Sequence, residues 1–356
     1  MRIVSLLPSA TESLFALGLG GDLVARTHEC DFPPEAAPLP VVTRSTHDLD
    51  GRASGSIEDA VALAAREGRS LYEVDTDAIL RLDPDLVVAQ DICDVCAIPA
   101  DQVADALAGV RILRQHPHSL ADVLGDIEDL ASACGVDARP LLSSLRRRIE
   151  AASEQASGVP RVRGVFLEWL DPPYPAGHWT PDLLALAGID DPLARPGVPS
   201  RALSWDEVAA AKPELLVVAP CGFDRARAKR EAAALSGSID ATGARQVVVL
   251  DGSAYFNRPG PRLVDSLELL VAHRARAADS PVSRLSPREL EVLREMAQGK
   301  TNGAIGAALV LSESAVEKHV NAIFSNLGLS EEPHVHRRVA AVLTYLRDSP
   351  RTTMPD

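Results

Sequence analysis

The sequence lacks long apolar runs. No stretch approaches the roughly 20 consecutive apolar residues that a helix needs to cross a bilayer, so we expect no membrane partner. Residues 3–7 are apolar except for Ser5, but only Arg2 is basic and Pro8 interrupts the run. A secretory signal needs about 7–15 uninterrupted apolar residues, so we expect no export signal and a cytoplasmic protein. This start instead predicts a strand, a turn and a helix capped by Ser9 and Glu12.

Motifs of several enzyme classes are lacking too. We find no Walker loop, no Gly-x-Gly-x-x-Gly after a strand, no Ser/His/Asp arrangement and no receiver domain with a phospho-accepting aspartate. We therefore expect neither an enzyme nor phosphorelay input. Positive charge is also scarce, because the sequence has 36 Lys and Arg but 50 Asp and Glu, for a net charge of -14. No overall field draws such a chain to nucleic acid, so DNA binding has to be argued from local motif geometry.

The composition is that of a globular protein. The chain has 356 residues, of which 46% are hydrophobic and 24% are charged. At about 100–200 residues per domain, this length predicts two or three domains. Apolar runs alternate with helical patterns, which is typical of an α/β fold, and short similar segments around Pro84 and Pro213 indicate two similar lobes. The expected strands are 2–7, 23–27, 86–90 and 110–113, followed by 162–168, 215–219 and 247–251.

The lobes are expected to be joined by a helical connector. Apolar residues recur at helical spacing from Leu120 to Cys134, and the pattern resumes after Pro140. We therefore predict an α/β sensor unit over residues 1–275, with a lobe at 1–113, a connector at 117–157 and a second lobe at 160–275. Residues 276–283 are small and polar and are predicted to be a linker. Residues 284–347 show only helical patterns, and 348–356 are predicted to be a disordered tail.

The C-terminal segment contains the most specific motifs. These are Leu285-Ser-Pro-Arg-Glu-Leu-Glu-Val-Leu293, Gly299-Lys-Thr-Asn302 and Ala315-Val-Glu-Lys-His-Val320. They resemble a LuxR-type helix-turn-helix domain, which implies four helices and binding to double-stranded DNA. The local signals agree, because Ser286 and Glu289 form a capping box pattern with proline at the first helical position. The alternative is a small helical bundle that contacts proteins.

Ser312 is expected to open the recognition helix, with Val316, Val320, Ile323 and Leu327 on its buried face. Between residues 281 and 347, eight basic and seven acidic residues leave a net charge of only +1, and Asn326 stands where the family usually has lysine. Because affinity for phosphates rests on positive charge, we expect a homodimer that reads an inverted repeat. The residues that the resemblance places near bases or phosphates are Lys300, Thr301, Asn302, Ser312, Ser314, Glu317, Lys318, His319 and Asn321.

The first 275 residues carry a second resemblance. Residues 2–12, residues 23–33, the strand after Pro84 and the segment 169–179 resemble the BtuF-like family of cobalamin-binding periplasmic proteins. This resemblance implies two lobes, a long bridging helix and a ligand cleft between the lobes. Aromatic residues cluster just after the expected strands, where open α/β sheets bind ligands, and they suit a flat corrinoid or porphyrin, although lobe packing accounts for some of them. The expected cleft residues are His28, Phe32, Trp169, His178, Trp179, Phe223, Tyr255 and Phe256.

Five cysteines, an odd number, argue against a disulfide framework in a chain without an export signal. Cys134 lies on the apolar stripe of the connector and is expected in the core. The other four follow three expected strands and can converge as ligands of zinc, copper(I) or an iron–sulfur cluster. Buried thiols and a redox dithiol are the alternatives. The candidate metal ligands are Cys30, Cys93, Cys96 and Cys221, with His28 as a spare ligand or an axial base for corrinoid cobalt.

These patterns together predict a one-component transcription regulator. A binding-protein-like sensor, holding a corrinoid or a cysteine-ligated metal centre, is expected to control DNA binding by the helix-turn-helix domain. Two other classes stay open at this point. One is a cytosolic corrinoid or metal carrier whose C-terminal helices contact proteins, and the other is an enzyme acting on a corrinoid with Cys93 and Cys96 as a redox pair.

Overall fold

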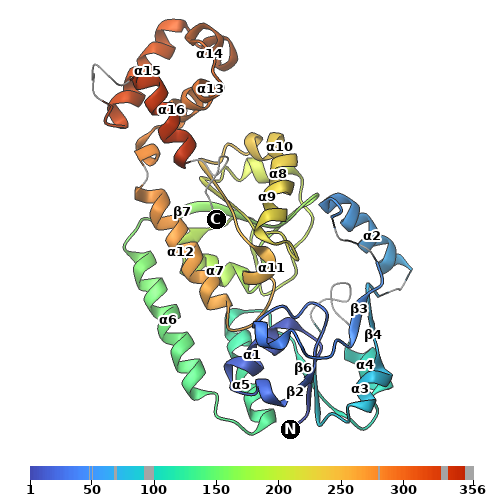
Figure 1. Ribbon diagram of the computed structural model, residues 1–356. Helices are drawn as coiled ribbons and strands as arrows, with labels where there is room; N and C mark the ends of the chain where they lie inside the picture. Colours follow the sequence, from blue (N-terminus) through green and yellow to red (C-terminus); the bar gives the residue numbers. More distant parts are fainter. Residues whose placement is uncertain are drawn as a thin grey trace.

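Two α/β lobes and a helical C-terminal domain make up the protein (Figure 1). The computed structural model describes residues 1–47, 49, 51–67, 70–91, 100–279, 281–329 and 336–348. The lobes are joined by α5 and α6, and α12 leads from the second lobe to the C-terminal domain. Within the described residues, no helix is long and apolar enough to span a membrane.

Lobe 1 is built on a four-stranded parallel sheet of order β2-β1-β5-β6. The strands β1, β2 and β5 are mainly apolar, as expected where helices cover both faces of a parallel sheet, whereas the edge strand β6 carries polar residues. The strands are β1 (Ile3–Ser5), β2 (Leu23–Ala25), β5 (Leu86–Gln90) and β6 (Arg111–Gln115), with an antiparallel pair β3 (Thr43–Ser45) and β4 (Tyr72–Val74) beside them. The helices are α1 (Pro8–Ala16), α2 (Ser54–Arg66), α3 (Thr76–Arg81) and α4 (Ala100–Ala106), with short 3-10 turns η1 (Gly20–Asp22) and η2 (Pro34–Ala36).

The start of α1 differs from the prediction. The helix begins at Pro8, follows Leu7 and has no side-chain cap, so the predicted capping box of Ser9 and Glu12 is wrong. Ser9 lies inside the helix, where its carbonyl oxygen accepts a hydrogen bond from Ser13. Proline at the first position supplies the fixed φ that a helix start needs and has no N–H to satisfy, which explains why no cap is required.

The connector consists of two helices, α5 (Leu120–Cys134) and α6 (Arg139–Ser157). Gly135 ends α5 in the left-handed conformation, with φ of 71°, so the predicted long connector is divided at this residue. The N-terminal end of α5 packs into the core of lobe 2 through Leu120 and Val123, and its C-terminal end packs into the core of lobe 1 through Leu130. The helix α5 therefore holds both lobes.

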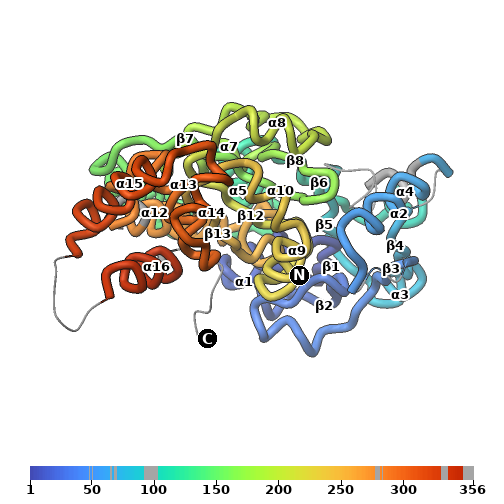
Figure 2. The backbone as a smooth tube through the Cα atoms, turned by 90° about the horizontal axis from the view of Figure 1, so that it is seen from above, coloured from blue at the N-terminus to red at the C-terminus, as the bar shows by residue number. Residues whose placement is uncertain are grey.

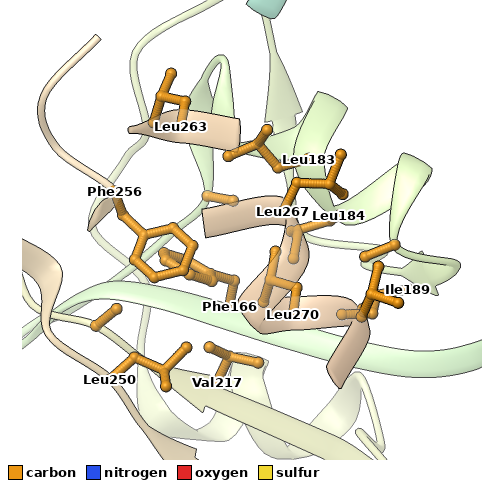
Figure 3. Packing of buried hydrophobic residues seen from close by; sticks show 14 of the residues in the cluster. Phe166, Leu183, Leu184, Ile189, Val217, Leu250, Phe256, Leu263, Leu267 and Leu270 are labelled. Carbon is orange, nitrogen blue, oxygen red and sulfur yellow. The ribbon is translucent and has the colours of Figure 1, made fainter. Parts of the chain in front are cut away.

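Lobe 2 has a mainly parallel sheet of order β10-β7-β12-β13, with β8 antiparallel to β7. Its core gathers apolar side chains from the sheet, α7 and α12, among them Phe166, Leu183 and Leu267 (Figure 3). The strands are β7 (Val162–Leu170), β8 (Pro173–Pro175), β9 (Gly177–His178), β10 (Ile189–Asp190), β11 (Arg195–Pro196), β12 (Leu215–Val218) and β13 (Gln246–Val249). The helices are α7 (Thr180–Leu186), α8 (Trp205–Ala210), α9 (Arg225–Ala234), α10 (Ser236–Ala241), α11 (Gly252–Tyr255) and α12 (Leu263–Asp279).

The helix α12 extends further than expected. It runs to Asp279, whereas the sequence predicts a linker from residue 276. Arg274, only 3% exposed, donates hydrogen bonds to the carbonyl oxygens of Ala156, Val159 and Ala187. These carbonyls lie at the C-terminal ends of α6 and α7, where a cation is favoured by the helix dipole. The last turns of α12 are thus anchored in lobe 2.

The C-terminal domain is a four-helix unit with its own core. Figures 1 and 2 both place it at the opposite end of the molecule from α3 and α4 of lobe 1. A side-chain contact joins it to lobe 2, because Arg294 donates to the carbonyl oxygens of Gly243 and Ala244. A 3-10 turn, η3 (Pro281–Arg284), precedes α13 (Pro287–Ala297), α14 (Asn302–Leu309), α15 (Glu313–Asn326) and α16 (Arg337–Asp348).

Candidate functional site

The recognition helix predicted from the sequence is α15. The Ser312 hydroxyl accepts a hydrogen bond from the Ala315 N–H at 3.2 Å, which caps the helix as expected. Val316, Val320 and Ile323 are buried in the domain core, and Leu327 packs against it. The predicted apolar face of this helix is confirmed.

The opposite face of α15 is open to solvent. Its exposed residues include Ser314, Glu317, Lys318 and Asn321, while His319 is half-buried. This face presents hydroxyl, carboxylate, ammonium and amide groups, which are the groups that read base edges and phosphates. The helix therefore has the form of a major-groove reader, with side chains free of the domain core.

Residues at the start of α14 are partly engaged within the domain. The Lys300 ammonium pairs with the Glu295 carboxylate, and the Asn302 side chain accepts a hydrogen bond from Arg338 of α16 at 2.8 Å. The Thr301 hydroxyl caps α14 by accepting from the Ala304 N–H. DNA contact by Lys300 or Asn302 therefore has to replace or share these interactions.

Asn326, the departure from the usual lysine, has a structural partner. Its side-chain amide donates to both carboxylate oxygens of Glu289, at 3.3 and 3.2 Å. Glu289 also accepts from the backbone N–H of Ser286, completing the predicted capping box at the start of α13. Asn326 thus ties the end of α15 to the start of α13 with no additional charge.

Loops at the carboxyl ends of the two sheets meet between the lobes. The loop after β2 in lobe 1 carries Asp31 and Phe32, and the segment after β13 in lobe 2 carries Arg258 and Arg262. Arg258 pairs with Asp31 and donates to the carbonyl oxygen of Glu29. Arg262 lies over the Phe32 ring, 4.2 Å from its centroid. In open α/β sheets these carboxyl ends are where ligands bind, so this junction is the candidate ligand site.

The predicted cleft aromatics fall into three groups. Trp179 and Phe256 are buried in the core of lobe 2, where the Trp179 indole N–H donates to the carbonyl oxygen of Phe256 at 2.8 Å. The Phe256 ring packs on Phe166, 5.0 Å between centroids, as Figure 3 shows, and Tyr255 is partly buried against the same core. For these three side chains the structure shows the lobe-packing alternative rather than a cleft lining.

Trp169 and Phe223 form the second group, which contacts lobe 1. Their rings lie 5.2 Å apart, and Ile57 of α2 packs against Phe223 in the same apolar cluster. Polar contacts reinforce this junction, because Arg227 donates to the carbonyl oxygens of Leu49 and Arg52. In the described state, α2 therefore covers this aromatic pair.

Phe32 and His28 form the third group and are more accessible. Phe32 is 41% exposed, the largest exposed fraction among the predicted cleft aromatics. The His28 Nδ1 atom lies 2.7 Å from the Thr43 hydroxyl, whereas its Nε2 atom is buried without a hydrogen-bond partner and lies 3.5 Å from the Glu29 carboxylate. A ring held at one nitrogen with the other nitrogen unpartnered is the usual arrangement of a metal-ligating histidine. The role of His28 as an axial base stays a prediction.

A histidine cluster lies where the connector meets lobe 2, and of its members the sequence analysis named only His178, as a cleft residue. The His116 and His118 rings are 4.4 Å apart, and the His118 and His178 rings are 5.6 Å apart. The Nδ1 atoms of His118 and His178 are buried without a hydrogen-bond partner. Burial, together with the neighbouring His118 and His116, lowers the pKa of His178. The spacing around Pro117 was the available signal, but His178 joins the cluster only through the fold.

The cysteines do not converge within the described part of the chain. Cys30 is 2% exposed, its sulfur lies 3.1 Å from the Thr11 hydroxyl, and burial raises its thiol pKa. A metal ligand has to be a thiolate, so these surroundings favour the buried-thiol alternative for Cys30. Cys221 is exposed, and Cys93 and Cys96 lie outside the described residues. Among the described residues, no group of three or more His, Cys, Asp or Glu side chains is arranged to hold a metal ion.

These features define a two-lobed binding protein joined to a helix-turn-helix domain. The model of the periplasmic binding protein family matches residues 3–254, and that of the luxR family of bacterial regulatory proteins matches residues 283–339. The chain belongs to the periplasmic binding protein family and carries a C-terminal luxR-family domain. The predicted resemblances and the predicted fold are both confirmed.

Individual relatives agree with this division. A vitamin B12-binding protein of Vibrio cholerae is 26% identical over 282 residues, covering 76% of this chain and 88% of the relative. A nitrate/nitrite response regulator protein homolog of Haemophilus influenzae is 34% identical over 87 residues, covering 24% of this chain and 38% of the relative. The second relative is therefore similar to less than a third of this chain.

Solved structures show the same fold for the sensor. The periplasmic vitamin B12 binding protein BtuF of Vibrio cholerae superposes with a TM-score of 0.57 at 24% identity, covering 78% of this chain and 97% of that one. The periplasmic heme-binding protein RhuT from Roseiflexus superposes with the same TM-score and identity, covering 98% of its own chain.

Proposed function

We propose that this protein is a cytoplasmic transcription regulator that binds a corrinoid, or another flat tetrapyrrole with a central metal, between its lobes. Ligand binding changes the affinity of the C-terminal domain for DNA. The observation that carries this proposal is α12, which contributes Leu263, Leu267 and Leu270 to the lobe 2 core and leads directly to the DNA-binding domain. A ligand acts through this helix only by its different affinity for two conformations of the sensor.

The ligand class rests on two observations. Relatives covering most of the sensor are vitamin B12-binding proteins, and the exposed Phe32 ring at the lobe junction offers a flat apolar surface. The unpartnered Nε2 atom of His28 offers an axial ligand to a central cobalt or iron. The fit is chemical, because imidazole is a preferred ligand of both metals when a tetrapyrrole leaves an axial position open.

A cysteine-ligated metal centre is the competing form of the sensor. The buried, hydrogen-bonded Cys30 thiol argues against it, because an uncharged thiol in this position is already satisfied by Thr11. An absorption spectrum with metal analysis on protein purified without oxygen separates the two forms. Stoichiometric iron with broad visible bands but without the Soret band of a heme, or stoichiometric zinc, supports the cysteine centre. A colourless, metal-free protein that binds added cyanocobalamin supports the tetrapyrrole sensor.

DNA binding is tested with operators selected from a random DNA pool by the full chain. We expect a homodimer on an inverted repeat, and a Kd that changes by about 5–150-fold with saturating cyanocobalamin or hemin. A chain ending at residue 279 is the matched control, since it keeps the sensor and α12, and it should retain ligand binding without DNA binding. Equal DNA affinity with and without both ligands contradicts the proposal.

A further inference from the structure

An ion cluster of three largely buried side chains and the Asp31 carboxylate, which is 67% exposed, joins the two lobes directly before α12. Glu12 of α1, only 2% exposed, accepts two hydrogen bonds from the Arg262 guanidinium, the longer at 2.8 Å, and Arg258 lies 3.5 Å away. Arg258 also pairs with Asp31, and the two arginine side chains are 6% and 14% exposed. We call Glu12, Asp31, Arg258 and Arg262 the inter-lobe ion cluster.

The partners come from opposite ends of the sensor sequence. Glu12 and Asp31 belong to lobe 1, whereas Arg258 and Arg262 follow the last strand of lobe 2. Arg262 immediately precedes Leu263, the first residue of α12. Separating the lobes therefore requires either that these pairs break or that the start of α12 moves with lobe 1.

The rest of α12 is fixed to lobe 2 and the connector. Arg148 of α6 pairs with Asp265 and Glu268, one turn after the inter-lobe ion cluster. Further along, Arg274 is bonded to three backbone carbonyls of lobe 2 and α6. The helix thus has one end in contact with lobe 1, a body anchored on lobe 2, and a far end that leads to the DNA-binding domain.

The candidate ligand site contacts the same cluster. Arg262 stacks on the Phe32 ring, and Phe32 is the most exposed of the predicted cleft aromatics. A flat ligand that packs on Phe32 competes with Arg262 for the ring or adds to the stack. In either case the position of Arg262, and with it the first turn of α12, depends on the ligand.

From these contacts we infer that the inter-lobe ion cluster couples the lobes to the DNA-binding domain, through the pairing of Glu12 with Arg262 and Arg258. This inference rests on the proposed function for its ligand and adds the regulatory contact. Because Glu12 and Arg262 are largely buried, loss of the Glu12 charge leaves the Arg262 guanidinium without a carboxylate partner, so the paired state is strongly preferred over a half-broken one. Such two-state behaviour is what a coupling element requires.

Two variants test the coupling. Glu12→Gln removes the carboxylate charge with little change of shape. Arg262→Gln removes the positive charge that pairs with Glu12, at the more exposed residue of the pair. Asp265→Asn is the matched control, because it breaks an ion pair of the same helix that does not involve lobe 1. Thermal melting by circular dichroism verifies that all three proteins are folded.

The first readout is the ratio of DNA Kd values with and without cyanocobalamin. We expect the wild type and Asp265→Asn to show the full ligand effect, and Glu12→Gln to lower the ratio to within about twofold of one while it still binds DNA and cyanocobalamin. Arg262 lies in the candidate ligand site, so the ratio for Arg262→Gln is measured at cyanocobalamin concentrations that saturate that variant. Folded Glu12→Gln and Arg262→Gln proteins that keep the wild-type ratio overturn the inference.

The second readout needs neither ligand nor DNA. Hydrogen exchange should be faster in α12 and α13 of Glu12→Gln than in the same helices of Asp265→Asn. If the wild-type DNA affinity does not respond to cyanocobalamin, the proposed function fails, and the exchange experiment still decides whether the cluster controls these helices. Equal exchange in the two variants overturns the coupling independently of the ligand.

Discussion

The guanidinium of Arg262 lies over the ring of Phe32, 4.2 Å from its centroid, and this stack spans the two lobes. Arg262 immediately precedes α12, the helix that leads to the DNA-binding domain. Phe32 is partly exposed and lies at the candidate ligand site. Cation–π contacts of this kind contribute about 0.5–2 kcal/mol, so the stack is weak enough for a bound ligand to rearrange it.

Phe32→Ala tests whether this ring contacts the ligand. We expect cyanocobalamin to bind up to about tenfold more weakly, because the corrin ring loses an aromatic packing partner worth about 0.5–1.5 kcal/mol. Thermal stability should change little, since the ring is 41% exposed. Leu80→Ala, at a residue 46% exposed on α3, is the matched control. Isothermal titration gives both affinities, and an unchanged Phe32→Ala affinity removes this ring from the site.

His28→Ala tests axial coordination. Aquacobalamin carries an exchangeable axial water on cobalt, so coordination by the His28 Nε2 atom should shift its visible spectrum on binding. We expect the shift with the wild type and with His47→Ala, an alternative histidine of lobe 1, but not with His28→Ala. A shift that persists in His28→Ala assigns the axial ligand to another group and contradicts this role.

Lys318→Ala tests the recognition face of α15. A lysine that contacts phosphate should weaken binding to all DNA sequences alike and reduce the slope of log Kd against log salt by about 1. Arg139→Ala is the charge-matched control, because Arg139 is a highly exposed cation on the connector whose partner is Asp137. Fluorescence anisotropy across a salt series gives the slopes. Equal slopes for Lys318→Ala and the wild type place this lysine outside the interface.

Asp126 on α5 predicts a pH dependence of stability. Burial, assisted by Asp129 and Asp122, raises the pKa of Asp126 to about 7, and one of its carboxylate oxygens has no hydrogen-bond partner. The folded state therefore holds a proton that the unfolded chain releases near pH 4, so this group's contribution to stability falls as the pH rises from about 4 to 7. Asp126→Asn should remove that contribution and raise the Tm at pH 8 relative to the wild type.

The control for this prediction is Glu128→Gln, at an exposed acidic residue of the same helix. Thermal melts at pH 5.5 and pH 8 should show a smaller pH effect in Asp126→Asn than in Glu128→Gln. The same pH effect in both variants shows that the Asp126 proton is not linked to folding.

Local signals predicted the elements well. The strands after Pro84 and Pro213 and the caps of Ser286 and Ser312 depend on neighbours within a few residues, and each lies where the sequence indicated. Parallel strands buried on both faces also give an unmistakable apolar run. These features need no knowledge of distant partners.

The candidate site was harder to predict, because its contacts are distant in sequence. Glu12 was interpreted as a capping residue, but its partners lie 246 and 250 residues further along the chain. Trp179 and Phe256 follow strands as cleft residues do, yet the turn of the chain directs them into the lobe 2 core. A position just after a strand predicts that the residue lies at the carboxyl edge of the sheet, but it does not predict the direction of the side chain.

Arg274 has a consequence for domain exchange. Its guanidinium donates hydrogen bonds to carbonyl oxygens at the C-terminal ends of two helices, α6 and α7. Leu263, Leu267 and Leu270 of the same helix belong to the core of lobe 2, so α12 is part of the sensor and not a separable linker. A chimera that replaces the DNA-reading part should be joined after residue 279. A graft made at the start of α12 would leave the sensor without one wall of its own hydrophobic interior, and the product would misfold before specificity could be compared.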